Sequence, residues 1–191
     1  MKHTRNFYSR DTKDVAKELL GMVLVHGYFS GYITETEAYI GTEDKASHAS
    51  WRKKETCFPM WGPAGFTYVY FTYGMHHMLN IVTEQPELPA AVLIRSLEPV
   101  TGIDTMIKNR NTENVQNLTT GPGKLTQALE IDKSHNNIDI TESDIIYITN
   151  EGALENFGIV TATRIGIDYA EEHKDKFWRY YIKDNPFVSR T

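Results

Sequence analysis

The chain has 191 residues, of which 40% are hydrophobic and 24% are charged, a size and composition that fit a single globular domain spanning residues 1–191. Its formal net charge of −5 argues against a polyanionic partner for the molecule as a whole, although a local basic patch can still bind phosphate. The sequence contains no apolar run of signal-peptide or membrane-spanning length, so we expect a soluble cytoplasmic protein with no membrane partner.

The single cysteine, Cys57, limits the covalent and metal chemistry of the chain. One thiol cannot form an internal disulfide, and it cannot supply the thiolate cluster of a structural zinc site. It also lacks an obvious Cys-His signature, so we do not expect it to be a catalytic nucleophile.

The first elements expected are a helix and a β-hairpin. Asp11 can cap a helix that follows it and that ends at Gly21. The apolar residues 22–25 predict a short strand, which turns through residues 27–31 into a second strand. We interpret the helix as scaffold.

The second strand, within residues 31–40, carries acids and an aromatic residue on one face. Alternate residues of a strand share a face, so Glu35, Glu37 and Tyr39 point the same way. One interpretation is a solvated outer face, because charged side chains are mostly exposed. The other is a pocket floor in which one glutamate acts as a general base.

A polar loop is expected over residues 42–55, and a turn-rich connection over residues 60–65. Residues 66–83 then predict two strands around a turn near Tyr73 and Gly74. Tyr73 and Met75 would occupy the exposed tip of this hairpin. Tyr73 could fold back on its own strands, or it could act as a wedge for a partner surface.

A nearly continuous apolar run over residues 90–97 predicts a buried strand that contains Arg95. A buried arginine needs a partner, and either Glu37 or the local Glu98 could supply it. The sequence next predicts a helix over residues 99–110 and a polar loop over residues 109–117. The remaining elements expected are a polar loop at 132–144, a strand at 145–149, one or two strands at 158–167 and a helix at 169–176.

Residues 119–129 read as a flexible loop that enters a helix. Free backbone N–H groups at such a helix start favour an anion, and Lys124 adds a positive charge. The spacing of a P-loop is absent, so a nucleotide-binding loop of that type is not expected.

Six blocks of the sequence, taken in order, closely resemble the 3-methyladenine (alkyladenine) DNA glycosylase family, in its bacterial form. The blocks cover nearly the whole chain and read TETEAYIGTEDKASH, MWGPAGFTYVYFTYGMHHMLNIVT, AVLIRSLEPVTG, TTGPGKLTQALEID, TRIGI and WRYYIKDNPFVSR. The resemblance implies an α+β fold in one domain, with a curved, mainly antiparallel β-sheet, flanking helices and a protruding DNA-inserting β-hairpin.

The same resemblance implies a monofunctional base-excision-repair enzyme. It would flip alkylated or deaminated purines, such as 3-methyladenine, 7-methylguanine, hypoxanthine and ethenoadenine, out of duplex DNA and hydrolyse the N-glycosidic bond. Its partner would be double-stranded DNA with damaged purines, and it would work as a nucleoid-associated monomer without cofactor or metal.

The resemblance also assigns roles to residues. Glu37 matches the general base that activates water, Arg95 matches the arginine that helps to hold this water, and Glu35 would be a bystander. Tyr39 and His48 match residues that stack on one face of the base, and Tyr70 matches the one on the other face. Asn80 matches a pocket-wall asparagine that disfavours normal guanine. The implied base pocket comprises Tyr39, Ala46, His48, Tyr70 and Asn80.

Tyr73, with Met75, matches the hairpin tip that fills the vacated base stack. The family's arginine-rich loop after the pocket histidine is altered here, which leaves several basic or backbone phosphate contacts as candidates. These candidates are Arg52, Lys53, Lys54, Gly123, Lys124 and Arg164. Solvated surface is the alternative interpretation for their side chains.

Two other functions fit parts of the sequence. A metal-dependent hydrolase could use Glu37, His48, His76 and His77, but adjacent histidines in a strand face opposite ways. A non-catalytic binder of damaged DNA could use the aromatic pocket without turnover, although the combination of Glu37 and Arg95 argues against it.

Overall fold

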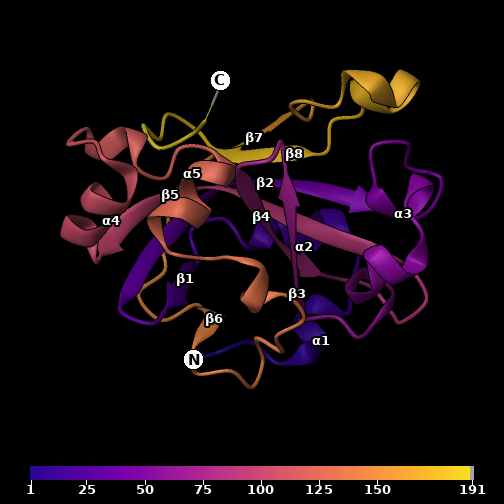
Figure 1. The fold of residues 1–191 in the computed structure, drawn as a ribbon, viewed down its shortest axis with the longest axis horizontal. Helices are drawn as coiled ribbons and strands as arrows, with labels where there is room; N and C mark the ends of the chain where they lie inside the picture. The colour runs from indigo at the N-terminus through magenta and orange to yellow at the C-terminus, as the bar shows by residue number, and fades with distance from the viewer. Residues whose placement is uncertain (190–191) are drawn as a thin grey trace.

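The computed structural model describes residues 1–189, and it is built around one long central strand, β2 (Phe29–Ile40) (Figure 1). One edge of β2 pairs along its length with β5 (Ala90–Thr101). The other edge pairs first with β1 (Val23–His26) and then with β8 (Arg179–Ile182). The predicted acidic strand is therefore confirmed, and it lies in the middle of the sheet.

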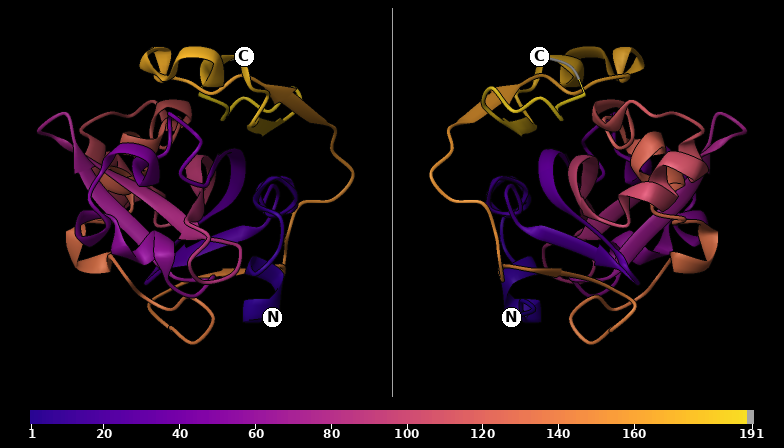
Figure 2. Two further views of the ribbon diagram at one scale, coloured as in Figure 1. Left: turned by 90° about the vertical axis from the view of Figure 1, so that its right-hand side faces the viewer. Right: turned by 90° about the vertical axis from the view of Figure 1, so that its left-hand side faces the viewer.

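The sheet has eight strands in the order β3-β4-β5-β2-β1-β6, with β8 joining β2 to β7, and each of these pairings is antiparallel. The sheet curls, and helices cover it (Figures 1 and 2). This arrangement confirms the predicted α+β class with a curved antiparallel sheet. In the described part of the chain, no helix has the length and apolar character needed to cross a membrane.

The first long helix, α2 (Thr12–Glu18), packs on β2 and starts where the sequence predicts. The Asp11 carboxylate accepts hydrogen bonds from the backbone N–H groups of Lys13 (2.9 Å) and Asp14 (3.3 Å), which satisfies two of the free donors at the helix start. Val15 and Leu19 are fully buried in the main core beneath the sheet.

Strands β3 (Thr67–Thr72) and β4 (His76–Val82) form the predicted hairpin, which projects from one side of the molecule (Figure 2). Tyr73 and Gly74 both have positive φ, at 52° and 66°, and the Met75 N–H donates to the Thr72 carbonyl. This is a type I′ turn, whose twist suits two-residue hairpins.

Residues 42–55 and the end of β5 differ from the sequence-based expectations. Residues 42–55 are not wholly loop, because Ser47 caps a short helix, α3 (His48–Trp51). Pro99 is not helical, because it continues β5 opposite Gly31, and helix α4 (Ile103–Arg110) begins only after Gly102. A Cβ atom at residue 31 would lie 2.8 Å from the Glu98 carbonyl oxygen, so this pairing requires glycine.

The remaining elements complete the fold. The expected helix near residue 170 is a 3₁₀ segment with a break at Glu171, and the region 158–167 contributes one strand. The remaining α-helices and strands are α1 (Arg5–Tyr8), α5 (Pro122–Ala128), β6 (Ile146–Thr149) and β7 (Ile159–Ala162). The 3₁₀ helices are Lys54–Thr56, Phe58–Trp61, Val115–Asn117, Lys133–His135 and Asp168–Asp175.

Candidate active site

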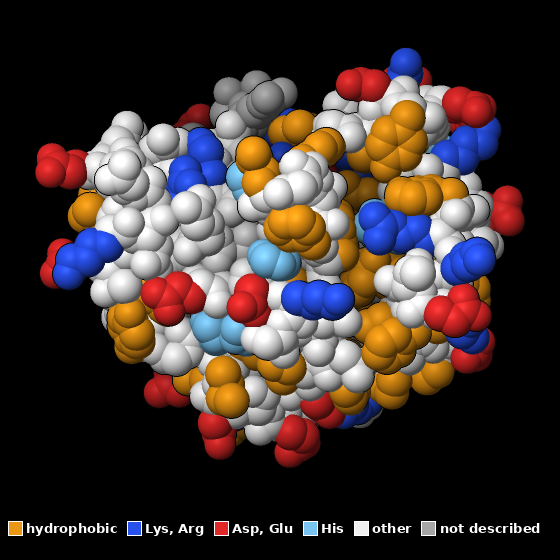
Figure 3. Space-filling view, viewed as in Figure 1, with side chains coloured by type: hydrophobic (Ala, Val, Ile, Leu, Met, Phe, Trp, Pro, Cys, Tyr) orange, Lys and Arg blue, Asp and Glu red, His pale blue; other side chains and the backbone are white. Residues whose placement is uncertain are grey.

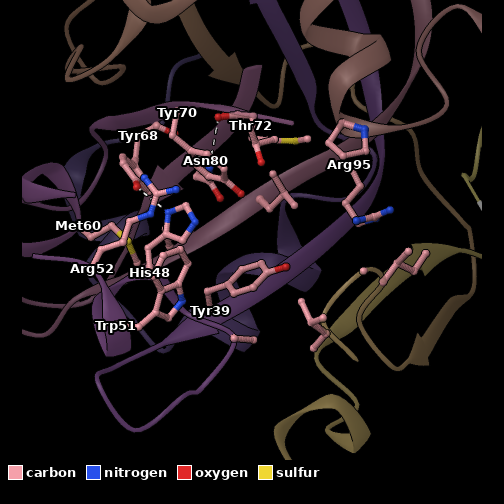
Figure 4. A pocket seen from close by; sticks show the side chains of 18 of the residues that line it. Tyr39, His48, Trp51, Arg52, Met60, Tyr68, Tyr70, Thr72, Asn80 and Arg95 are labelled. Carbon is pink, nitrogen blue, oxygen red and sulfur yellow. Dashed lines mark hydrogen bonds between the residues drawn. The ribbon is translucent and has the colours of Figure 1, made fainter. Parts of the chain in front are cut away.

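A pocket of about 370 Å³ opens at the centre of the sheet, where β2, β3, β4 and β5 meet the loop around residue 165 (Figure 4). The predicted base-pocket residues all line it, although they come from four different parts of the chain. They are Tyr39, Ala46, His48, Tyr70 and Asn80, and Arg95 lines it as well. In Figure 3 a hollow with hydrophobic walls lies beside basic side chains on this face.

The Glu37 carboxylate is completely buried on β2, which rules out the solvated-face interpretation. Its Oε1 accepts a hydrogen bond from the Ile165 N–H (2.8 Å) and lies 3.2 Å from an Arg95 terminal nitrogen. Its Oε2 accepts a hydrogen bond from the Tyr39 hydroxyl at 2.8 Å. One oxygen is thus fixed by the protein interior, and the other is in contact with a pocket side chain.

Arg95 bridges two buried glutamates rather than pairing with Glu98. Its Nε donates to Glu35 Oε1 at 3.1 Å, while its other end faces Glu37. Arg179 also donates to Glu35 Oε1, at 2.9 Å. Two positive guanidinium groups thus lie against the two carboxylates, which balances the buried charge.

Glu35 is therefore integrated into the site, although the resemblance implied a bystander. Its Oε2 accepts hydrogen bonds from the Ser96 hydroxyl (2.7 Å) and the Ser189 N–H (2.8 Å). Burial alone would raise the pKa of Glu35, but Arg95 and the hydrogen bonds from Ser189 and Ser96 hold this pKa below its usual value. Glu35 therefore stays ionised and orients Arg95.

The aromatic side chains form a wall in which the phenols stay protonated. Burial and the nearby Glu37 carboxylate raise the pKa of Tyr39 well above its usual value, so its hydroxyl remains a donor. Burial, and then the charge of Arg52, lowers the pKa of His48 to about 3. His48 is therefore neutral at neutral pH, and its Nδ1 shares a hydrogen bond of 2.7 Å with the Tyr68 hydroxyl.

His48 and Tyr70 touch each other in this structure. Their ring centroids lie 4.2 Å apart, at an angle of 63°. A purine between two rings needs two van der Waals gaps, so the rings would have to stand roughly 7 Å apart. The predicted sandwich of these two rings around a base therefore requires them to separate.

Asn80 and Ala46 occupy the wall without forming part of the carboxylate network. The Asn80 side-chain amide donates to the Tyr68 carbonyl at 3.0 Å, which fixes its orientation on β4. Ala46 is buried and packs with Tyr39 and Ile167. Its small side chain leaves room in the pocket.

Arg164, expected at a phosphate, lies instead in the interior. Both its terminal nitrogens bind the Asp44 carboxylate, at 2.6 and 2.8 Å, and both side chains are fully buried. Its guanidinium lies 4.8 Å from the centre of the Tyr39 ring. Because it has no surface to offer a phosphate, we correct the expectation and assign it to the support of Tyr39.

The other expected phosphate contacts differ in accessibility. Lys53 is exposed, whereas Lys54 pairs with Glu87 at 2.7 Å and Lys124 donates to Asn117. Gly123 is buried, and a Cβ atom there would lie 2.7 Å from the His76 ring, so close packing explains this glycine. Lys53 and Lys54 are both exposed, and Lys53 has no ion-pair partner within residues 1–189.

The hairpin tip stands at the pocket mouth. Tyr73 lines the pocket although 77% of the residue is exposed, and Met75 is 68% exposed. Tyr73 does not fold back on its strands to bury itself.

The histidines considered for a metal site, His76 and His77, belong to β4. Within residues 1–189 no group of three or more His, Cys, Asp or Glu side chains is placed to hold a metal.

Several pocket residues were not anticipated from the sequence. Trp51 follows His48 on α3, and Tyr169 comes from the C-terminal part of the chain. Trp51 is 56% exposed and Tyr169 is 60% exposed. Exposed aromatic side chains of this kind indicate a binding site, but exposure cannot be read from sequence alone. Tyr68, Thr72 and Ile167 also line the pocket.

Comparison with known proteins agrees with this site. The family model described as Methylpurine-DNA glycosylase matches residues 6–186. The chain belongs to the methylpurine-DNA glycosylase family. A relative from Alkaliphilus oremlandii is 49% identical over 203 residues, and one from Clostridium perfringens (strain SM101 / Type A) is 47% identical over 204 residues. Both alignments cover 100% of each chain, and each relative is named "Putative 3-methyladenine DNA glycosylase".

Family membership fixes the class of activity. The protein is a DNA glycosylase, an enzyme of base-excision DNA repair, and DNA is its substrate. A relative from Desulfitobacterium hafniense, 48% identical over 97% of both chains, carries the same name. The carboxylates, the arginine and the aromatic wall described above are thus the candidate machinery of a glycosylase.

Proposed function

We propose that the enzyme extrudes alkylated or deaminated purines from duplex DNA and hydrolyses their N-glycosidic bond with a water activated by Glu37. The observation that carries this proposal is the buried Glu37 carboxylate behind the aromatic pocket, with Arg95 on one oxygen and Tyr39 on the other. No other carboxylate is hydrogen-bonded to a side chain of the predicted base pocket within residues 1–189.

In this mechanism Glu37 acts as a general base. Water attacks C1′ of the extruded nucleotide as the bond from C1′ to the base nitrogen breaks, and the proton of the water passes to Glu37. The base leaves with the bonding electrons: a base methylated at N3 or N7 is already a cation and departs neutral, whereas hypoxanthine first takes up a proton from solvent and then departs neutral. A nearby carboxylate also stabilises the positive charge that develops on the sugar.

Arg95 and the Ile165 N–H prepare this base. They hold Oε1, so Oε2 is the oxygen that takes the proton once the Tyr39 hydroxyl yields or shares its hydrogen bond. General-base catalysis contributes roughly 10²–10⁴-fold in rate.

Aromatic stacking explains how one pocket takes several damaged bases. Every purine presents a π-face, and stacking on an aromatic side chain is worth roughly 1–3 kcal/mol per base. Purine nucleotides methylated at N3 or N7 are cations, which strengthens their stacking on tyrosine. We propose that Tyr39, His48 and Tyr70 supply these faces, and that Asn80 crowds the exocyclic amino group of normal guanine.

We infer that Tyr73 and Met75 enter the vacated stack and that Lys53, with Arg52, contacts phosphate. The exposure of the hairpin tip at the pocket mouth supports this role. An inserted side chain offsets part of the few kcal/mol that extrusion costs. We propose that the enzyme acts as a monomer on the nucleoid DNA of a bacterial cytoplasm.

The deciding experiment is a single-turnover assay on duplexes with one hypoxanthine or one ethenoadenine, followed by alkaline cleavage of abasic sites. Wild type should cleave, and Glu37→Gln should lose roughly 10²-fold or more in rate while still binding the lesion. Glu98→Gln is the matched control, because it removes one carboxylate from β5 without touching the pocket. Equal rates for Glu37→Gln and wild type would remove Glu37 as the base. Lesion binding without cleavage by the wild type would favour a non-catalytic binder.

A further inference from the structure

Arg52 follows α3 directly, and its side chain lies within the aromatic wall (Figure 4). The guanidinium carbon lies 4.9 Å from the centre of the Trp51 ring and 5.7 Å from the centre of the Tyr70 ring. Arg52 also lines the base pocket. A planar cation thus lies near the Tyr70 ring, which is proposed to stack on a planar base.

The surroundings of Arg52 differ from those of the other arginines near the pocket. Arg95, Arg164 and Arg179 each have a buried carboxylate partner. Arg52 has no carboxylate partner within residues 1–189, and its Nε is buried without a hydrogen-bond partner. Its attachment therefore rests on ring faces, which leaves a donor unsatisfied and makes the position easy to vacate.

The rings around Arg52 are arranged as in a pocket without a base. His48 and Tyr70 are in contact, and Trp51 packs edge-on against His48 at 5.1 Å. Arg52 bridges from α3 to Tyr70 on β3, so it holds these rings together from the side. A purine nucleotide methylated at N3 or N7 is itself a cation, so in the same subsite it would also repel the Arg52 guanidinium.

We propose that Arg52 occupies the aromatic subsite of the DNA-free enzyme and that the extruded purine displaces it. A base can therefore enter only if it stacks on Tyr70 more favourably than Arg52 does. This inference rests on the proposed function, and it adds a specificity-determining residue to it. In the DNA-free enzyme this role is additional to the phosphate contact proposed above for the DNA complex, which requires only a positive charge near the backbone.

The test is the affinity of the protein for a free base in the absence of DNA. The probe is free 1,N6-ethenoadenine, whose own fluorescence reports stacking. Wild type, Arg52→Ala, Arg52→Lys and Lys45→Ala are titrated as full-length proteins. Lys45→Ala is the matched control, because it removes a charge three residues before α3 that pairs with Glu171 and Glu172.

Arg52→Ala should bind the free base about tenfold more tightly than wild type, equivalent to about 1.4 kcal/mol. Arg52→Lys should fall between them, because an ammonium retains charge without the stacking plane. Lys45→Ala should match wild type. Equal affinities of Arg52→Ala and wild type, or no binding by either, would overturn the proposal.

A parallel assay separates failure of this inference from failure of the proposed function. Wild-type excision of hypoxanthine from a duplex establishes the glycosylase on its own. If excision occurs while Arg52→Ala leaves free-base affinity unchanged and only weakens duplex binding with a shallower salt dependence, Arg52 is only a phosphate contact and its occupation of the subsite is overturned.

Discussion

The ion pair between Asp44 and Arg164 joins two segments that are 120 residues apart. Because both side chains are fully buried, removing one charge leaves the other without compensation. Asp44→Asn should therefore lower the free energy of unfolding by about 3–5 kcal/mol, as measured by urea denaturation. Lys45→Ala, at the next position, breaks only the exposed pairs with Glu171 and Glu172 and should change the midpoint little. Similar losses in both variants would contradict a special cost of the buried pair.

His48 makes a testable contribution to the pH dependence of stability. Its pKa is lowered to about 3 in the folded protein, against about 6.5 when unfolded. As pH falls below 6.5 the unfolded chain takes up a proton that the folded chain does not, so stability is lost between pH 6.5 and 3.

At pH 5, which is 1.5 pH units below 6.5, the stability lost through His48 is at most about 2 kcal/mol, because each pH unit corresponds to about 1.36 kcal/mol. His48→Asn cannot titrate, so it should lose less stability than wild type between pH 7.5 and 5 in urea unfolding. The comparison cancels the carboxylates that the two proteins share. An equal loss in both would show that the folded protein protonates His48 readily.

At the residue scale, sequence reasoning found the acids and aromatics but not their network. The alternation in β2 correctly placed Glu35, Glu37 and Tyr39 on one face, yet it could not decide whether that face is buried. Glu35 is enclosed by Arg179 and Ser189, which lie 144 and 154 residues away along the chain. Such distant contacts have no local sequence signal. The sequence therefore suggests no role for Glu35 and wrongly places Arg164 at a phosphate.

At the scale of elements, the β3–β4 hairpin offers the sharpest prediction. Tyr73→Ala retains the positive-φ turn position and removes only the exposed ring. We expect stability to change by less than about 0.5 kcal/mol, while lesion-specific duplex affinity and single-turnover rate fall.

The tip of the other hairpin provides a matched control. Tyr28 lies between β1 and β2, and it is 59% exposed but does not line the pocket. Tyr28→Ala should therefore keep wild-type affinity, measured by fluorescence anisotropy on a hypoxanthine duplex. Wild-type affinity in Tyr73→Ala would defeat the wedge assignment.

Elements with strong local signals were predicted well. The Asp11 cap, the β1–β2 hairpin and the turn at Tyr73 and Gly74 follow from residues adjacent in sequence. The end of β5 was not predicted, because Pro99 ordinarily suggests a break. Only its pairing opposite Gly31, whose missing side chain admits the Glu98 carbonyl, allows the strand to continue.

For the whole molecule, charge distribution governs DNA binding. The net charge is −5, so DNA binding depends on local cations such as Lys53, which is exposed and has no ion-pair partner within residues 1–189. Each phosphate neutralised adds about −0.9 to the slope of log affinity against log salt. Lys53→Ala should make this slope shallower by about that amount, whereas Lys13→Ala on α2 should leave it unchanged. Identical slopes for wild type and Lys53→Ala would place the phosphate contacts elsewhere.

The position of Glu37 in the double-sided ladder of β2 has a kinetic consequence. Opposite Glu37 lie Leu93 on one side and Arg179 on the other, so its amide proton should exchange with deuterium only when the whole domain opens. The four-residue helix α3 lacks such ladders, and its amide protons should exchange through local fraying. The proton acceptor should thus lie in a slowly exchanging part of the molecule, whereas His48 and Trp51, which form one side of the aromatic wall, are carried by a segment that should exchange fast.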